Sequence, residues 1–191
     1  MARLLNRNII LGITGSIAAY KAAELTRDLI REGANVRVVM TEGACEFITP
    51  LTMQALSGHD EHMDLLDTDA EAAMGHIELA RWADVMLIAP ATANTISKMA
   101  NGACDNLLLA TYLSLKCPCI LAPAMDLDMY QHPSFKRNLA TLEADKMHVI
   151  PATFGALASG LEGQGRMEEP ETIIEFIRNL EDGVKKKLLN L

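Results

Sequence analysis

The sequence has no long apolar run, no secretory signal and no basic stretch, and each absence excludes a class of protein. Apolar residues make up 50% of the 191-residue chain, yet none of their runs approaches the ~18 residues of a membrane span. Residues 1–10 lack the pattern of a secretory signal. The net charge is −8, without a basic stripe, which argues against nucleic acid as a main partner. We therefore expect a cytoplasmic protein that binds neither membranes nor nucleic acids.

Cysteines are also few. The spacing of the four, at Cys45, Cys104, Cys117 and Cys119, is not that of a small disulfide scaffold. Cys117 and Cys119 enclose a single proline, which is too close for a C-x-x-C site. No His/Cys spacing is typical of a metal site. We interpret the thiols as buried and inert, and we expect no metal.

No internal repeat, low-complexity segment or domain break divides the chain, so residues 1–191 are expected to form one domain. Apolar runs typical of strands alternate with segments of helical spacing. The strand-like runs cover residues 8–14, 35–41, 84–90, 117–123 and 148–152. One long helix is expected over 93–115, with Gly102 inside it, and a loop over the acidic residues 60–74. This alternation predicts an α/β fold with a parallel sheet and right-handed crossovers.

Two strand-like runs end in Ala-Pro and then in small or amide-bearing residues. Thr92, Asn94 and Thr95 follow one run, and Asp126 and Asp128 follow the next. Open α/β sheets bind ligands at the carboxyl ends of their strands. We therefore expect these side chains on one rim of the sheet, as binding groups.

The first strand-like run leads into a small-residue turn at Gly15 and Ser16. Such a turn lets backbone N–H groups approach an anion at a helix start. It matches neither the full G-x-G-x-x-G fingerprint nor a phosphate-binding P-loop, so a purely structural turn fits equally well. Residues 41–43 end the second run in a similar way. Several such turns on one rim favour a phosphorylated planar cofactor lying across them.

Five short motifs occur in order: GITGSIAAYK, GHIELARWAD, APATANT, PAMDLDMYQHP and ASGLEGQGRM. Together they resemble the flavin-containing cysteine decarboxylases, from about Ile9 to Pro170. The resemblance implies a flavodoxin-like, doubly wound three-layer sandwich, with FMN at a subunit interface of a homotrimer or of a dodecamer of four trimers. It implies phosphopantothenoylcysteine, a precursor of coenzyme A, as the substrate. In many bacteria this module is fused to a phosphopantothenate–cysteine ligase, so the chain is either a stand-alone enzyme or half of a bifunctional protein.

The same matches assign site residues. His76 matches the catalytic histidine, which can accept a proton near neutral pH; without the resemblance, a structural helix start is the better interpretation. Met129 and Arg166 match substrate-binding positions, and Arg166 lies in a Gly-rich segment that would cover the substrate or, in the alternative, form a surface turn. The residues that match FMN contacts are Gly15, Ser16, Ile17, Thr41, Thr92, Ala93, Asn94, Thr95 and Ala124.

Two positions depart from the family pattern. Asp126 stands where the family has an asparagine that binds the substrate carboxylate. An ionised aspartate cannot donate a hydrogen bond and repels a carboxylate; it must be protonated, be displaced, or serve a different substrate. Ser159 stands at the position of the proton-donating cysteine. A hydroxyl is a far weaker acid than a thiol, so the final reduction of the enethiol product is expected to slow.

Three functions remain open at this point. The leading one is FMN-dependent decarboxylation of phosphopantothenoylcysteine: the flavin oxidises the cysteine moiety to a thioaldehyde, carbon dioxide leaves, and the enethiol is reduced. Peptidyl-cysteine oxidative decarboxylation would account for Asp126 and Ser159. A catalytically silent flavin-binding or regulatory subunit fits too, because both departures fall on residues that would act on the substrate and not on residues that match FMN contacts. Asp105 and Asn106 either contact flavin or cap a helix broken at Gly102; we favour a structural interface role.

Overall fold

The computed structural model describes residues 4–59 and 75–189, so the expected loop over 60–74 lies outside the described residues. A five-stranded sheet forms the centre, in the order β2-β1-β3-β4-β5, and every pairing in it is parallel. Its strands are β1 (Asn8–Ile13), β2 (Asn35–Met40), β3 (Val85–Ala91), β4 (Cys119–Pro123) and β5 (His148–Val149). This order is that of the flavodoxin-like doubly wound fold, and the predicted fold class is confirmed.

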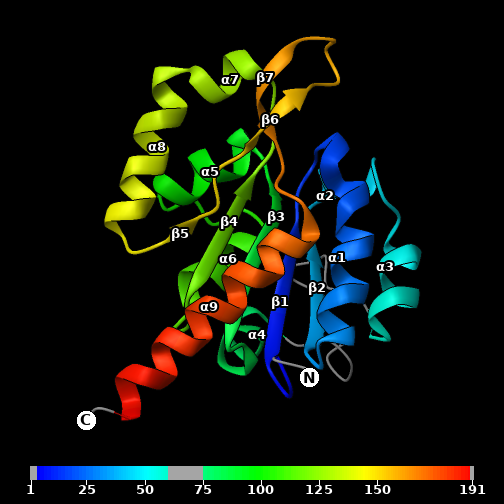
Figure 1. Ribbon diagram of the computed structural model, residues 1–191, viewed down its shortest axis with the longest axis vertical. Coiled ribbons are helices and arrows are strands. Elements are labelled where there is room, and N and C mark those ends of the chain that lie inside the picture. The colour runs from blue at the N-terminus through cyan, green and yellow to red at the C-terminus, as the bar shows by residue number, and fades with distance from the viewer. Residues whose placement is uncertain (1–3, 60–74, 190–191) are drawn as a thin grey trace.

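Helices cover both faces of the sheet and give three layers (Figure 1). One face carries α1 (Tyr20–Arg31), α3 (Pro50–Ser57) and α9 (Pro170–Leu189). The other carries α4 (His76–Trp82), α5 (Ala93–Ala100), α6 (Leu107–Ser114) and α8 (Pro133–Ala144). Successive strand residues alternate between these layers: Leu11 packs in the core under α1, and Ile10 packs in the core under α6. The short elements are a 3-10 turn (Ile17–Ala19), α2 (Glu42–Cys45) and α7 (Leu127–Gln131).

The predicted long helix over 93–115 is wrong, because the segment forms two helices. α5 ends at Ala100, and Gly102 follows with a φ of +67°, a conformation that suits glycine and stops a helix. Asn106 then caps α6, its side-chain oxygen accepting a hydrogen bond from the Leu109 N–H at 2.9 Å. The structure bears out the capping role considered for Asn106; a contact with flavin stays a prediction.

An antiparallel hairpin is the element that the sequence pattern did not reveal. Its strands are β6 (Thr153–Ala156) and β7 (Glu162–Arg166), and it lies beside α7, beyond the carboxyl ends of β3 and β4 (Figure 1). β7 lies very close to the chain after β4: the Met125 N–H donates to the Gly165 carbonyl at 3.0 Å. A Cβ on Gly165 would lie 2.2 Å from the Met125 carbonyl oxygen, so only glycine fits there.

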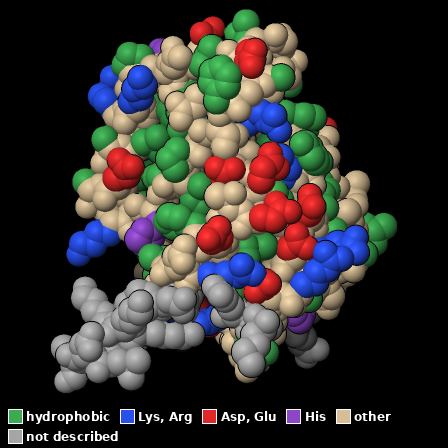
Figure 2. Space-filling view, in the orientation of Figure 1, with side chains coloured by type: hydrophobic (Ala, Val, Ile, Leu, Met, Phe, Trp, Pro, Cys, Tyr) green, Lys and Arg blue, Asp and Glu red, His purple; other side chains and the backbone are tan. Residues whose placement is uncertain are grey.

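One surface is strongly acidic. The carboxylates of Glu24 and Asp28 on α1 and Glu171 on α9 lie within 4.8 Å of one another, and acidic side chains gather over these helices on the face that Figure 2 shows. Such a face repels the phosphates of nucleic acids. Among the helices of the described residues, none has the length and apolar character needed to cross a membrane.

Candidate functional site

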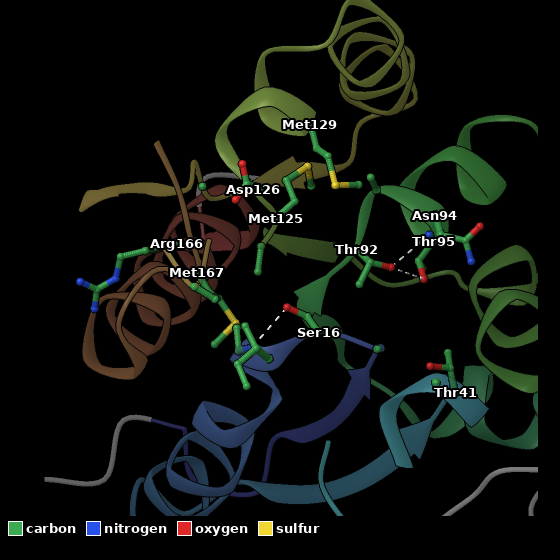
Figure 3. A pocket seen from close by; sticks show the side chains of 18 of the residues that line it. Ser16, Thr41, Thr92, Asn94, Thr95, Met125, Asp126, Met129, Arg166 and Met167 are labelled. Atoms are coloured by element: carbon green, nitrogen blue, oxygen red, sulfur yellow. Dashed lines mark hydrogen bonds between the residues drawn. The ribbon is translucent and has the colours of Figure 1, made fainter. Parts of the chain in front are cut away.

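A cavity of about 1040 Å³ opens at the carboxyl ends of β1, β2, β3 and β4, with the β6–β7 hairpin on one side (Figure 3). Its walls include all twelve residues that the resemblance implicates in FMN or substrate binding. They are Gly15, Ser16, Ile17, Thr41, Thr92, Ala93, Asn94, Thr95, Ala124, Asp126, Met129 and Arg166. Of the five side chains expected on one rim, Thr92, Asn94, Thr95 and Asp126 line this cavity. Asp128 does not, because it lies exposed on α7 and outside the described lining.

The turns after β1 and β2 approach each other closely. A Cβ on Gly15 would lie 2.9 Å from the backbone of Gly43, so the first turn needs glycine for this approach. The Ser16 hydroxyl accepts a hydrogen bond from the Ala18 N–H at 3.2 Å and caps the 3-10 turn. Thr41 is tied back to β1 through its N–H, which donates to the Ile13 carbonyl at 3.0 Å. This pair of turns forms one wall of the cavity.

The turn after β3 is fixed by a chain of hydroxyl groups. Thr14, which is buried, donates to the Pro90 carbonyl at 2.6 Å and accepts from the Thr92 N–H at 3.0 Å. The Thr92 hydroxyl in turn accepts from the Thr95 N–H at 3.3 Å and caps α5. The N-terminus of α5 thus faces the cavity, where its N–H groups favour an anion. Sequence reasoning missed Thr14, whose only signal is a polar residue directly after an apolar strand.

Positive charge in the cavity wall is balanced by carboxylates. Lys98 forms an ion pair with Asp105, and both line the cavity. Lys21 and Arg166 both pair with Glu169. Asp126 stands at the N-cap position of α7, but its carboxylate makes no capping hydrogen bond. Its side chain is available to a ligand.

His76 and Ser159 do not belong to the described lining of the cavity. His76 is the first residue of α4 and is half-buried. Ser159 is exposed in the turn between β6 and β7, where its hydroxyl accepts from the Leu161 N–H at 3.4 Å. The neighbouring Ala158 does line the cavity, so Ser159 sits at its edge.

The four cysteines differ in environment, and the interpretation that all are buried was wrong for Cys104, which is exposed. Cys119 is fully buried, and burial raises the pKa of its thiol far above the ordinary value. Burial likewise raises the pKa of the half-buried Cys117 thiol, to about 11. These two thiols are protonated at neutral pH and fit the expected inert role.

Comparison with known proteins places the chain in a family. Residues 2–181 match the Flavoprotein family. The chain is 48% identical over 171 residues to the coenzyme A biosynthesis bifunctional protein CoaBC of Bacillus subtilis (strain 168), covering 90% of this chain and 42% of that protein. It is 45% identical over 173 residues to CoaBC of Escherichia coli (strain K12), covering 91% and 43%. The chain therefore spans less than half the length of these relatives.

Solved structures share the fold over their whole length. A cysteine-to-serine mutant of PPC decarboxylase complexed with pantothenoylaminoethenethiol has a TM-score of 0.83 and 34% identity, with 93% of this chain and 99% of that chain covered. The FMN binding protein AtHal3 has a TM-score of 0.81 and 33% identity, with 93% of this chain and 98% of that chain covered. The FMN-dependent cysteine decarboxylase SpaF has a TM-score of 0.78 and 27% identity, with 94% of this chain and 98% of that chain covered. The chain belongs to the Flavoprotein family, among its flavin-containing cysteine decarboxylases.

Proposed function

We propose that this protein catalyses the FMN-dependent decarboxylation of phosphopantothenoylcysteine in coenzyme A biosynthesis. The observation that carries the proposal is the cavity at the strand ends, which gathers all twelve of the implicated binding residues in one place. The support from relatives is the likeness to PPC decarboxylase over 99% of that chain. The likeness to the bifunctional CoaBC proteins over 90% of this chain supports the same pathway.

The cavity fits FMN in size and in chemistry. Its apolar side chains, Ile17, Met129 and Met167, suit a planar ring, and the N-terminus of α5 suits a phosphate. The close approach of Gly15 to Gly43 brings the turns after β1 and β2 together along one wall of the cavity. When bound, FMN supplies the oxidation of the cysteine moiety and the later return of electrons.

We assign proton transfer to His76, which reaches the site of a neighbouring copy of the chain. Imidazole accepts a proton near neutral pH, as oxidation of a thiol-bearing substrate requires. His76 does not line the cavity of its own chain. The adjacent Ile77 is 49% exposed, as expected for a residue that a second subunit covers. A homotrimer with the site at the subunit interface, alone or within a dodecamer, meets this requirement.

We assign substrate binding to Asp126, Met129 and Arg166, which line the cavity on the side of α7 and the hairpin. The Arg166 guanidinium can pair with an anionic group of the substrate. Ser159 at the hairpin turn is expected to slow reduction of the enethiol, because a hydroxyl donates a proton less readily than a thiol. Part of the product should then leave in the oxidised form, and the two electrons taken from it would stay on FMN.

A peptidyl-cysteine substrate is the second candidate. Asp126 and Ser159 both depart from the coenzyme A pattern, and the likeness to SpaF covers 94% of this chain. The larger identity to the PPC decarboxylase, 34% against 27%, favours phosphopantothenoylcysteine.

One experiment separates the two candidate substrates. The FMN-loaded protein is incubated without oxygen, either with phosphopantothenoylcysteine or with a peptide ending in cysteine. Mass spectrometry should show loss of carbon dioxide from phosphopantothenoylcysteine, with or without the further loss of two hydrogens that marks the oxidised product. Decarboxylation of the peptide alone would move the assignment to the second candidate. No mass change with either substrate, with FMN still bound, would indicate a silent flavoprotein.

The product of a phosphopantothenate–cysteine ligase is the proposed substrate, so such a ligase is the expected partner, fused to this module or separate. The bifunctional nature of the CoaBC relatives supports this expectation. That this protein acts in the cytoplasm stays a prediction.

A further inference from the structure

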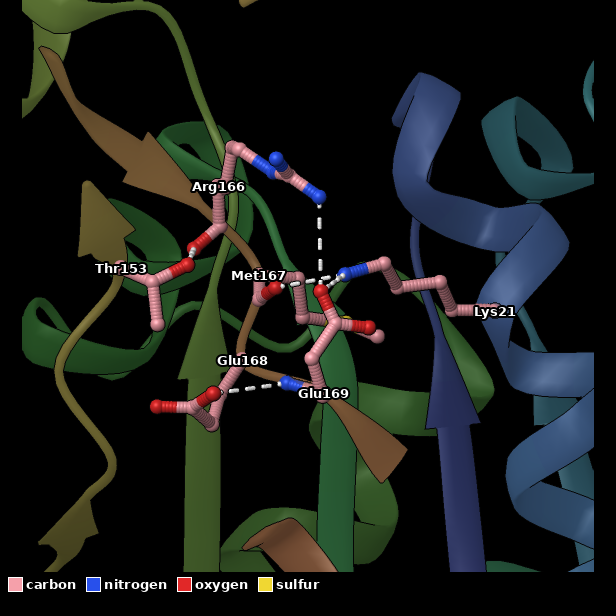
Figure 4. A network of polar contacts seen from close by, with 6 residues as sticks. All are labelled: Lys21, Thr153, Arg166, Met167, Glu168 and Glu169. Carbon is pink, nitrogen blue, oxygen red and sulfur yellow. Dashed lines mark hydrogen bonds and ion pairs between the residues drawn. The ribbon is translucent and has the colours of Figure 1, made fainter. Parts of the chain in front are cut away.

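Lys21 is a charged side chain that the protein almost encloses. It lies in the first turn of α1, and only 6% of its side chain is exposed. Its Nζ donates to the Met167 carbonyl oxygen at 2.9 Å and to Glu169 Oε1 at 2.8 Å (Figure 4). A buried ammonium group is costly unless it is paired and hydrogen-bonded. Lys21 therefore anchors the segment that follows β7, at Met167 and Glu169, to α1.

The same carboxylate oxygen also meets Arg166 at the edge of the cavity. Arg166 Nη2 lies 3.4 Å from Glu169 Oε1 (Figure 4). The Arg166 side chain also lies against the bare backbone of Gly155, where a Cβ would come within 3.0 Å of Cδ and Nη1. The Arg166 guanidinium thus contacts Glu169, and Glu169 in turn contacts Lys21.

The hairpin is held on its other side as well. The hydrogen bond between the Met125 N–H and the Gly165 carbonyl joins β7 to the segment that carries Asp126. Residues 165–169 are therefore held between α1 and the β4–α7 segment, which are two walls of the same cavity. Release of either contact would free the end of β7 to move relative to the cavity.

We propose that Lys21 is a positioning residue for substrate binding. Through the Met167 carbonyl and the Glu169 carboxylate, it fixes the end of β7, and with it the Arg166 guanidinium, over the cavity. The inference rests on the proposed function, in which Arg166 meets an anionic group of the substrate. Without the ammonium group, Glu169 keeps its ion pair with Arg166 but loses its link to α1. Both side chains can then move away from α1 together.

The kinetic test uses Lys21→Met, which keeps most of the side-chain volume and removes the charge. We expect KM for phosphopantothenoylcysteine to rise about tenfold, the effect of one charge-assisted hydrogen bond, with kcat and FMN content close to wild type. Glu169→Gln should give a similar rise, and the double variant should be no worse than either single one. Arg31→Met, which breaks an exposed ion pair with Asp28 on the same helix, is the matched control and should keep the wild-type KM.

Limited digestion with trypsin tests the same inference without substrate. Cleavage after Arg166, identified by fragment mass, should be several-fold faster in Lys21→Met than in wild type or Arg31→Met. Glu169 is half exposed, so Glu169→Gln serves if Lys21→Met does not fold. Faster cleavage in a protein whose wild type turns over nothing would support the positioning role and overturn the proposed function. Loss of FMN from Lys21→Met, or unchanged KM and unchanged cleavage, would overturn the positioning role.

Discussion

At position 126 the cavity presents a carboxylate, and the proposed substrate carries one too. Asp126 lines the cavity and makes no capping hydrogen bond to α7. An ionised carboxylate cannot donate to the substrate, whereas the amide of an asparagine can. We therefore expect this side chain to set how well the substrate carboxylate is held.

Asp126→Asn should raise kcat/KM for phosphopantothenoylcysteine about tenfold, because a repulsion is replaced by a donated hydrogen bond. Steady-state kinetics measures this, with Asp128→Asn as the control, since Asp128 is exposed on the same short helix and does not line the cavity. A fall in kcat/KM for Asp126→Asn would show that the carboxylate takes part in substrate binding or proton transfer.

Thiol reactivity should follow the different environments of the cysteines. At pH 8 the Cys117 thiol, with a pKa of about 11, is ionised in roughly one molecule in a thousand, and the thiolate is the reactive form. Iodoacetamide should therefore modify the exposed Cys104 first and spare Cys117 and Cys119 in the folded protein. Peptide mapping over time checks this, and Cys104→Ala should remove the fast phase. Early labelling of Cys119 would contradict the buried placement of β4.

At the scale of the elements, the site consists of turns that follow parallel strands. The turns after β1 and β2 meet where Gly15 approaches Gly43, and the turn after β3 leads into α5. The sheet register fixes where these turns begin, so the site depends on the strands staying in place.

Gly15→Ala should weaken FMN binding at least tenfold, because its Cβ would lie 2.9 Å from the Gly43 backbone and push the two turns apart. Gly43→Ala, whose Cβ would find nothing nearer than 3.6 Å, should weaken binding less. Fluorescence titration with FMN gives both affinities. Equal losses in the two variants would show that the close approach is not what shapes the site.

The strands and the binding turns could be predicted because their signals are local. Continuous apolar runs indicate buried parallel strands, and the polar residues after them must lie on one edge. The β6–β7 hairpin could not be predicted in this way, because its position follows from contacts between residues distant in sequence. One example is the close approach of Gly165 to the Met125 backbone. The helix break at Gly102 depends on one backbone conformation and one cap. The position of His76 relative to the cavity depends on tertiary structure.

At the scale of the whole molecule, one chain does not gather every assigned group. The described cavity contains the binding residues but not His76, and in the proposed trimer a second copy would supply this histidine. A cyclic homotrimer places the same two different surfaces against each other at every interface, which lets each histidine serve its neighbour.

Mixed trimers test this arrangement. His76→Asn and Gly15→Ala should each be nearly inactive alone, the first lacking the base and the second lacking FMN. When the two chains are co-expressed, roughly a quarter of the wild-type activity should return, since one ordered pair of neighbours in four combines an intact cavity with an intact histidine. Absence of any recovery in mixed trimers would place His76 in the site of its own chain.

The most direct measurement is the release of isotope-labelled carbon dioxide from phosphopantothenoylcysteine labelled in its cysteine carboxylate. The FMN-loaded protein should release the label under anaerobic conditions, and the His76→Asn protein with FMN bound should not. Retention of the label by the FMN-loaded wild-type protein would contradict the proposed decarboxylation.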